Sequence, residues 1–186
     1  MINSICVYCA SRTDIDPVYF QAAEELGHTI AEKGCTLVYG GASIGLMGAT
    51  ARTVKAHGGR VVGIIPEALQ KHEITFREAD DIIVTADLRD RKALMEKNAD
   101  AFITLPGGFG TLEEVLEVIT SKYLHYHHKP IILLNINGYY DPLQALFEHL
   151  FAQSFANPNY RKVYYFSDSV ADAFAYLDRY HMEHRA

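Results

Sequence analysis

Residues 101–114 read AFITLPGGFGTLEE. The apolar run at 101–105 is typical of a buried strand, the glycines at 107–110 of a tight turn, and the periodic apolar positions from residue 112 onward of a helix. The first N–H groups of such a helix lack partners within it and carry partial positive charge, which favours phosphate. This pattern puts Glu113 and Glu114 on the first helical turn, where phosphate alone gains nothing from carboxylates. We therefore expect a phosphate site with acids for chemistry on the neighbouring sugar.

Short apolar runs alternate with helical patterns along the whole chain. The runs lie at 5–9, 36–39, 61–65, 82–84, 101–105, 131–134 and 163–166. A helical stretch with Phe20, Ala23, Leu26 and Ile30 on one side ends at Lys33-Gly34, and further helical patterns cover 44–57, 88–98, 111–124, 140–152 and 169–179. The alternation predicts an α/β, three-layer Rossmann-like fold, with a mostly parallel sheet of about seven strands and helices on both faces.

Composition limits the class of protein. A chain of 186 residues, 49% hydrophobic and 22% charged, is expected to form one domain with a substantial core. A net charge of −6 without a basic stripe argues against a nucleic-acid partner. No apolar run reaches the roughly 18 residues of a membrane span, and the N-terminus has no signal-peptide pattern. We expect a cytoplasmic protein without a membrane partner.

Two clusters contain residue types that bind metals. Cys6 and Cys9 form a C-x-x-C motif, but they lie in and at the end of an apolar strand with no second ligand pair, which favours core thiols. The HYHH segment at 125–128 follows a helix and precedes Lys129-Pro130, so we expect a solvated loop. Neither cluster predicts a metal site.

Three turns rich in small residues follow predicted strands, at 9–12, 40–48 and 106–114. Ligands of such sheets bind beyond the carboxyl ends of the strands, so the turns together predict a nucleotide-sized ligand. The turn after the first strand lacks G-x-G-x-x-G, which argues against a dinucleotide site. Residues 40–45 have P-loop spacing, but Leu46 replaces the lysine.

Two charged clusters each allow two interpretations. Thr111 and Glu114 have the spacing of a capping box, in which the glutamate only satisfies a backbone N–H, or Glu114 is catalytic. The segment DLRDRK at 87–92 places cations at a helix start, where they oppose the helix dipole. Either it is a solvated face, or an anion compensates: Asp87 and Asp90, or a bound phosphate.

Four motifs together resemble the Lonely Guy (LOG) family of cytokinin riboside 5′-monophosphate phosphoribohydrolases, many of which carry the older label "possible lysine decarboxylase". PGGFGTLEE at 106–114 matches the family's PGGxGTxxE, and YGGASIGLMG at 39–48 is similar to YGGGxxGLMG. DLRDRKALM at 87–95 is similar to D-M-H-x-R-K-A-x-M, with Leu88-Arg89 in place of Met-His, and LNINGYY at 134–140 is similar to LNxxGYY. The resemblance covers residues 5–166.

The resemblance implies a single Rossmann-like nucleotide-binding catalytic domain over residues 1–186, usually a homodimer with its sites near the interface. It implies hydrolysis of the N-glycosidic bond of a nucleoside 5′-monophosphate, cytokinin riboside 5′-monophosphate or AMP, to free base and ribose 5-phosphate, without a metal or organic cofactor. The implied catalytic residues are Arg91 and Glu114. The implied substrate-binding residues are Ser11, Gly41, Met47, Glu73, Arg91, Lys92, Gly107, Gly108, Phe109, Gly110, Thr111, Leu112, Glu113 and Thr120.

Each implied residue group has a chemical role. Glu114 would stabilise an oxocarbenium-like transition state or activate water, while Glu113 holds ribose hydroxyls. Arg91 stays protonated, so it would stabilise charge on the departing base or orient the ligand. Lys92 and the amides of 107–111 would hold the phosphate.

Two other functions stay open. The chain could be a non-catalytic nucleotide-binding or carrier protein of the same fold. It could also be a lysine decarboxylase dependent on pyridoxal phosphate, with Lys92 or Lys122 as the Schiff-base lysine. The base preferred by a hydrolase, N6-prenylated adenine, adenine or another, also stays open.

Overall fold

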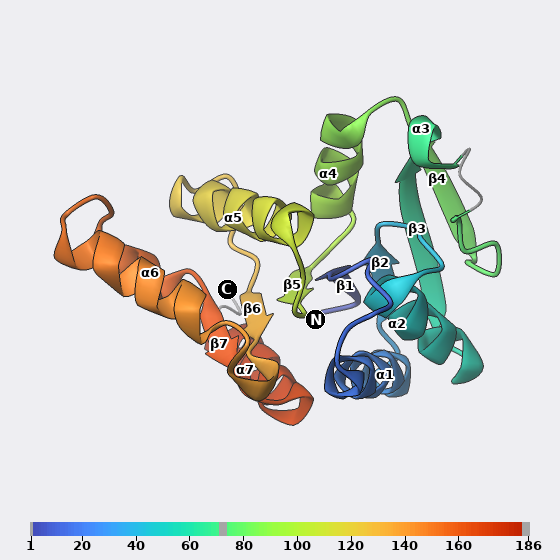
Figure 1. Ribbon diagram of the computed structural model, residues 1–186, viewed down its shortest axis with the longest axis horizontal. Helices are drawn as coiled ribbons and strands as arrows, with labels where there is room; N and C mark the ends of the chain where they lie inside the picture. The colour runs from blue at the N-terminus through green and yellow to red at the C-terminus, as the bar shows by residue number, and fades with distance from the viewer. Residues whose placement is uncertain (1, 71–73, 184–186) are drawn as a thin grey trace.

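A parallel sheet forms the centre of the molecule. The computed structural model describes residues 2–70 and 74–183 (Figure 1). Within these residues the strands are β1 (Ser4–Tyr8), β2 (Thr36–Tyr39), β3 (Arg60–Pro66), β4 (Asp81–Thr85), β5 (Ala101–Thr104), β6 (Ile131–Leu134) and β7 (Tyr165–Ser167). All neighbouring strands pair in parallel, in the order β4-β3-β2-β1-β5-β6-β7. The predicted fold class is confirmed.

The strand order places the ligand site. The chain runs outward from β1 through β4 and then crosses back to β5, on the other side of β1. The order reverses between β1 and β5, and their register pairs Tyr8 with Thr104 at the carboxyl ends. A crevice beyond this reversal point is where open α/β sheets bind ligands.

Helices cover both faces of the sheet. They are α1 (Pro17–Glu32), α2 (Gly45–Ala56), α3 (Glu67–Gln70), α4 (Leu88–Lys97), α5 (Phe109–Tyr123), η1 (Ile136–Gly138), α6 (Asp141–Ala152), η2 (Pro158–Lys162) and α7 (Val170–Glu183). One core lies under α1, α2 and α7, and the other lies under α4, α5 and α6 (Figure 1). The three layers expected from the sequence are present.

Strand β1 shows why the apolar runs are continuous. Ile5 and Val7 pack into one core, while Cys6 and Tyr8 pack into the other. Side chains alternate along a strand, so a strand covered on both faces has no polar side. The buried thiols of Cys6 and Cys9 confirm that the C-x-x-C motif belongs to the core.

The ends of two helices test the capping predictions. Gly34 has φ of +68°, in the left-handed region that closes α1 as predicted. The capping-box interpretation of Thr111 and Glu114 is wrong, because α5 begins at Phe109 with Gly108 as its N-cap and without a side-chain cap. Glu113 and Glu114 therefore lie on the second turn of α5 and not on the first. An extended Gly108 lets the helix begin at Phe109, two residues before the predicted start at residue 111.

Three short features were not anticipated. Helix α3 follows β3, and η1 and η2 flank α6. Turn η2 occupies residues 158–162, so β7 begins at Tyr165 and not at Val163. The predicted loop at 125–128 also differs, because His127 is buried and its Nε2 lies 3.0 Å from the Val118 carbonyl. None of the described helices has the length and apolarity needed to cross a membrane.

Candidate active site

The three turns predicted from the sequence do meet at one edge of the sheet. They border a cavity of about 410 Å³ beyond the carboxyl ends of β1, β2 and β5. Arg91 of α4 also reaches this cavity. The predicted site residues that line it are Ser11, Met47, Arg91, Gly108, Phe109, Gly110, Thr111 and Glu114.

The start of α5 offers amide donors to the cavity. The N–H groups of residues 108–111 have no hydrogen-bond acceptor among the residues that the structure describes, and no side chain caps this end. By contrast, α2 also begins at this edge, but the Leu46 N–H donates to the Ala10 carbonyl at 3.0 Å. The free amides and the helix dipole make α5 the better anion site.

Arg91 reaches the cavity because two local features allow it. Asp87 caps α4, with its Oδ1 accepting a 2.9 Å hydrogen bond from the Asp90 N–H, so the cations that follow lie on an ordered helix. A Cβ on Gly40 would lie 2.0 Å from Arg91 Nη2, so only glycine leaves room for the guanidinium at the end of β2. Arg91 Nε is buried without a hydrogen-bond partner in the described chain. A buried donor without a partner calls for an explanation, and a bound ligand is one such explanation.

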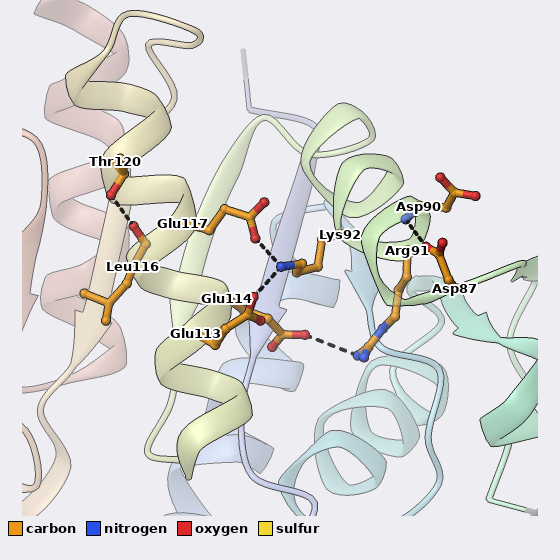
Figure 2. Close-up of polar contacts among 9 residues, drawn as sticks. All are labelled: Asp87, Asp90, Arg91, Lys92, Glu113, Glu114, Leu116, Glu117 and Thr120. Carbon is orange, nitrogen blue, oxygen red and sulfur yellow. Dashed lines mark hydrogen bonds and ion pairs between the residues drawn. The ribbon is translucent and has the colours of Figure 1, made fainter.

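Arg91 and Glu114 form an ion pair inside the cavity. Arg91 Nη2 lies 3.4 Å from Glu114 Oε1, and the two side chains are only 12% and 13% exposed (Figure 2). Burial raises the pKa of the Glu114 carboxyl above its ordinary value of 4.5, and the Arg91 guanidinium opposes that rise. A buried carboxylate with a fixed cation beside it has the electrostatics of a reactive group.

Lys92 points to a different set of acids. Its Nζ pairs with Glu113, and it lies 2.5 Å from Glu117 Oε2 (Figure 2). These carboxylates raise the pKa of Lys92. Hence Arg91 and Lys92 are compensated by acids of α5, in addition to the Asp87 cap, and the solvated-face interpretation is wrong for these two residues. Asp90 is exposed and forms no ion pair with Arg91 or Lys92 in the described part of the chain.

The other predicted site residues that the structure describes do not line the cavity. Gly41, Gly107, Lys92, Leu112 and Glu113 are not among the cavity-lining residues. Thr120 lies two turns farther along α5, where its Oγ1 donates to the Leu116 carbonyl at 2.8 Å and it borders a separate apolar groove. Glu73 lies outside the described residues.

The sequence did not single out the apolar wall of the cavity. Ile44, Leu69, Ile74 and Met95 line it, from four segments of the chain. Apolar residues in these segments carry no local signal that separates a cavity wall from a core. Gly40 was also missed, although it stands in the quoted YGG motif.

Fold and site together define a Rossmann-like α/β protein with a carboxylate–guanidinium pair in a cavity at the strand-order reversal. Residues 47–177 match the family described as "Possible lysine decarboxylase". The chain is 43% identical over 180 residues to the cytokinin riboside 5'-monophosphate phosphoribohydrolase LOG7 of Arabidopsis thaliana, covering 96% of this chain and 82% of that protein. It is 41% identical over 176 residues to the cytokinin riboside 5'-monophosphate phosphoribohydrolase LOG of Oryza sativa subsp. japonica, covering 95% and 73%. This chain belongs to the LOG family.

A solved structure shares the architecture. The molybdenum cofactor carrier protein of Chlamydomonas reinhardtii superposes with a TM-score of 0.74 at 26% identity, covering 97% of this chain and 98% of that one. The same fold therefore occurs in a protein named as a cofactor carrier, and function has to be argued from the site.

Proposed function

We propose that this protein hydrolyses the N-glycosidic bond of a nucleoside 5′-monophosphate, as a single catalytic domain over residues 1–186. The observation that carries the proposal is the buried Arg91–Glu114 pair, which shares one cavity with the free amides at the start of α5. The names of the LOG relatives, which act on cytokinin riboside 5'-monophosphates, support the same reaction.

Glu114 acts at the sugar. As the bond between the anomeric carbon and the base nitrogen breaks, its electron pair leaves with the base and positive charge develops on the sugar. The Glu114 carboxylate stabilises that charge and accepts a proton from the attacking water. The departing base anion takes up a proton from solvent and Glu114 releases its proton to solvent, so that the products are the free base and ribose 5-phosphate.

Arg91 acts on the departing base. A guanidinium stays protonated at physiological pH, so it is a poor proton donor. It stabilises the negative charge on the base by hydrogen bonding, and its unpartnered Nε provides one such donor.

The start of α5 holds the 5′-phosphate. The amides of residues 108–111 are the donors. Gly107 and Lys92, which do not line the cavity of the single chain, also contribute to phosphate binding. Glu113 and Leu112 lie on the same helix, and Glu113 holds ribose hydroxyls once substrate draws it from Lys92. Binding energy from the phosphate orients the reacting carbon, so nucleosides without phosphate are poor substrates. We further propose that Ser11, Gly41, Met47, Glu73 and Thr120 contribute to substrate binding.

The test is chromatography of the products formed from AMP, N6-isopentenyl-AMP and the two corresponding nucleosides. Base released only from the monophosphates would support the proposal, and the ratio of the two rates would rank adenine against N6-prenylated adenine. Absence of base from every nucleoside monophosphate would overturn it and leave the carrier function.

The lysine decarboxylase alternative fits the cavity poorly. Among its described lining residues there is no lysine, so a Schiff base would have no amine there. Lys92 is engaged by two glutamates, and Lys122 is buried under the Tyr180 ring on another part of α5. These residues do not place an amine where pyridoxal phosphate could react with it.

We also propose a homodimer with its sites near the interface. Several apolar side chains at and around α4 and α5 are exposed in the single chain, namely Val84, Leu88, Phe109, Leu116 and Leu124. Burying such side chains against a second copy would remove them from water. Sedimentation equilibrium at micromolar concentration tests this, and a monomer mass would contradict it.

The proposed location is the cytoplasm. Cys6, Cys9 and Cys35 are all free thiols in the structure. Proteins of oxidising compartments usually pair their cysteines, so the thiols support a reducing compartment. Microscopy of a fluorescent fusion tests the assignment.

A further inference from the structure

The LNINGYY segment at 134–140 contains two tyrosines for which the proposed reaction provides no role. It follows β6, which pairs directly with β5, so it lies beside the turn that leads into α5. Tyr140 is 1% exposed and Tyr139 is 40% exposed. Their hydroxyl groups both reach the backbone of that turn.

Three consecutive carbonyl groups of the turn each accept a hydrogen bond from another segment. The Tyr140 hydroxyl donates to the Leu105 carbonyl at 2.8 Å, and the Tyr139 hydroxyl donates to the Gly107 carbonyl at 2.7 Å. Between them, the Ala10 N–H donates to the Pro106 carbonyl at 3.2 Å. The orientation of each peptide plane in the turn is therefore fixed from outside the turn.

The bond to Gly107 has a direct consequence for the anion site. In a planar trans peptide, the carbonyl of one residue and the N–H of the next point in opposite directions. Tyr139 therefore holds the Gly108 N–H away from itself, and Gly108 lines the cavity. Without that donor, the Gly107–Gly108 peptide can rotate and the first amide of the anion site loses its direction, because glycine restricts rotation least.

Tyr139 is itself held in place. Its ring makes edge contacts with Tyr19 of α1 and with Tyr140, at centroid distances of 5.7 and 5.0 Å. The backbone beside it is fixed by Asn135, whose Oδ1 accepts from the Tyr140 N–H at 2.6 Å and whose Nδ2 donates to Asp141 at 2.7 Å. These contacts fix the position of the Tyr139 hydroxyl, so the side chain does not rotate freely at the surface.

We propose that Tyr139 is a positioning residue that sets the affinity of the cavity for phosphate, by holding the Gly107–Gly108 peptide with its N–H toward the ligand. This inference rests on the proposed function of the cavity as a site for nucleoside 5′-monophosphates. Tyr140 holds the Leu105–Pro106 peptide, but proline has no N–H to direct at a ligand. Tyr139 therefore acts on ligand affinity, whereas Tyr140 acts on the stability of the fold.

The test compares Tyr139→Phe with wild type by calorimetric titration of ribose 5-phosphate and of adenosine. We expect about fivefold weaker binding of ribose 5-phosphate, the effect of one misplaced hydrogen bond, with the affinity for adenosine unchanged. Tyr126→Phe is the matched control, since Tyr126 is 79% exposed and it does not line the cavity. Tyr140→Phe should instead lower Tm, because the buried Leu105 carbonyl loses its donor.

The possible results separate the role of Tyr139 from the phosphate site and from the proposed reaction. Equal ribose 5-phosphate affinity in wild type and Tyr139→Phe would overturn this inference alone. Equal losses for ribose 5-phosphate and adenosine, together with a lower Tm, would also overturn it and indicate a merely structural role. Failure of wild type to bind ribose 5-phosphate would overturn the phosphate site as well, whereas binding without turnover of any monophosphate would overturn only the proposed reaction.

Discussion

Replacing Glu114 by glutamine removes the negative charge from the cavity and leaves the side-chain volume nearly unchanged. A carboxylate about 4 Å from a developing positive charge stabilises it by about 4 kcal/mol at an effective dielectric constant of about 20. The side chain is 13% exposed, so the charge is only partly screened by water. Since about 1.4 kcal/mol corresponds to a tenfold change in rate, we expect kcat to fall about 10³-fold.

The pH dependence of the wild type tests the same assignment. Burial raises the pKa of Glu114 above 4.5. The carboxylate is the active form, so kcat/KM should fall as the pH falls through that raised pKa, giving an acid limb above pH 4.5. This limb should be absent from the residual activity of Glu114→Gln.

Stability should move in the opposite direction to activity. The unfolded chain has the ordinary pKa, so the contribution of Glu114 to folding becomes less favourable as the pH rises from 4.5 through the raised folded value. Glutamine stays neutral and removes that loss, so Tm at pH 7 should not fall below that of wild type. Thermal melts at pH 7 measure this.

The assay is initial-rate chromatography of base released from AMP and N6-isopentenyl-AMP. Glu117→Gln is the matched control on the same helix, because Glu117 pairs with Lys92 outside the cavity lining, and its kcat should stay near that of wild type. A Glu114→Gln enzyme within tenfold of wild type would refute the charge argument. So would an equal loss in Glu117→Gln, which would point to the net charge of α5 instead.

Three further changes test other parts of the structure. Gly40→Ala places a Cβ 2.0 Å from Arg91 Nη2 and should lower kcat about tenfold or more with little change in Tm; an unchanged kcat would contradict the close approach. Arg91→Lys keeps the charge but loses the planar fork, so kcat in the base-release assay should fall about 10²-fold, and full activity would reduce Arg91 to a simple cation. Lys122→Met should raise the free energy of unfolding at pH 7 by about 1–3 kcal/mol. Burial lowers the pKa of Lys122 from 10.5 to about 8, so the folded state is destabilised by the buried charge, and the Tyr180 ring offsets only part of this destabilisation. Urea melts should also show that wild type gains stability from about pH 8 to 10.5, whereas the variant does not.

Local patterns in the sequence were sufficient for the architecture. Apolar runs overlapped each of the strands in the described residues, because a strand covered on both faces has mostly apolar side chains. Gly34 located the end of α1, because few other residues adopt its backbone conformation. The N-cap of α5 was misplaced by three residues, since Thr111 resembles a cap while Gly108, the glycine before Phe109, serves as one.

The sequence by itself determined the layers and the three turns at the carboxyl ends of the strands, because these follow from periodicity and from the rules of parallel sheets. The strand order, with its reversal between β1 and β5, came from the tertiary structure. Only the tertiary structure decided that Arg91 faces Glu114 while its neighbour Lys92 faces Glu113 and Glu117. It also decided that the Tyr139 hydroxyl meets the Gly107 carbonyl, across 32 residues of chain. Such pairings depend on how two elements pack against each other, and neither element carries that information in its local pattern.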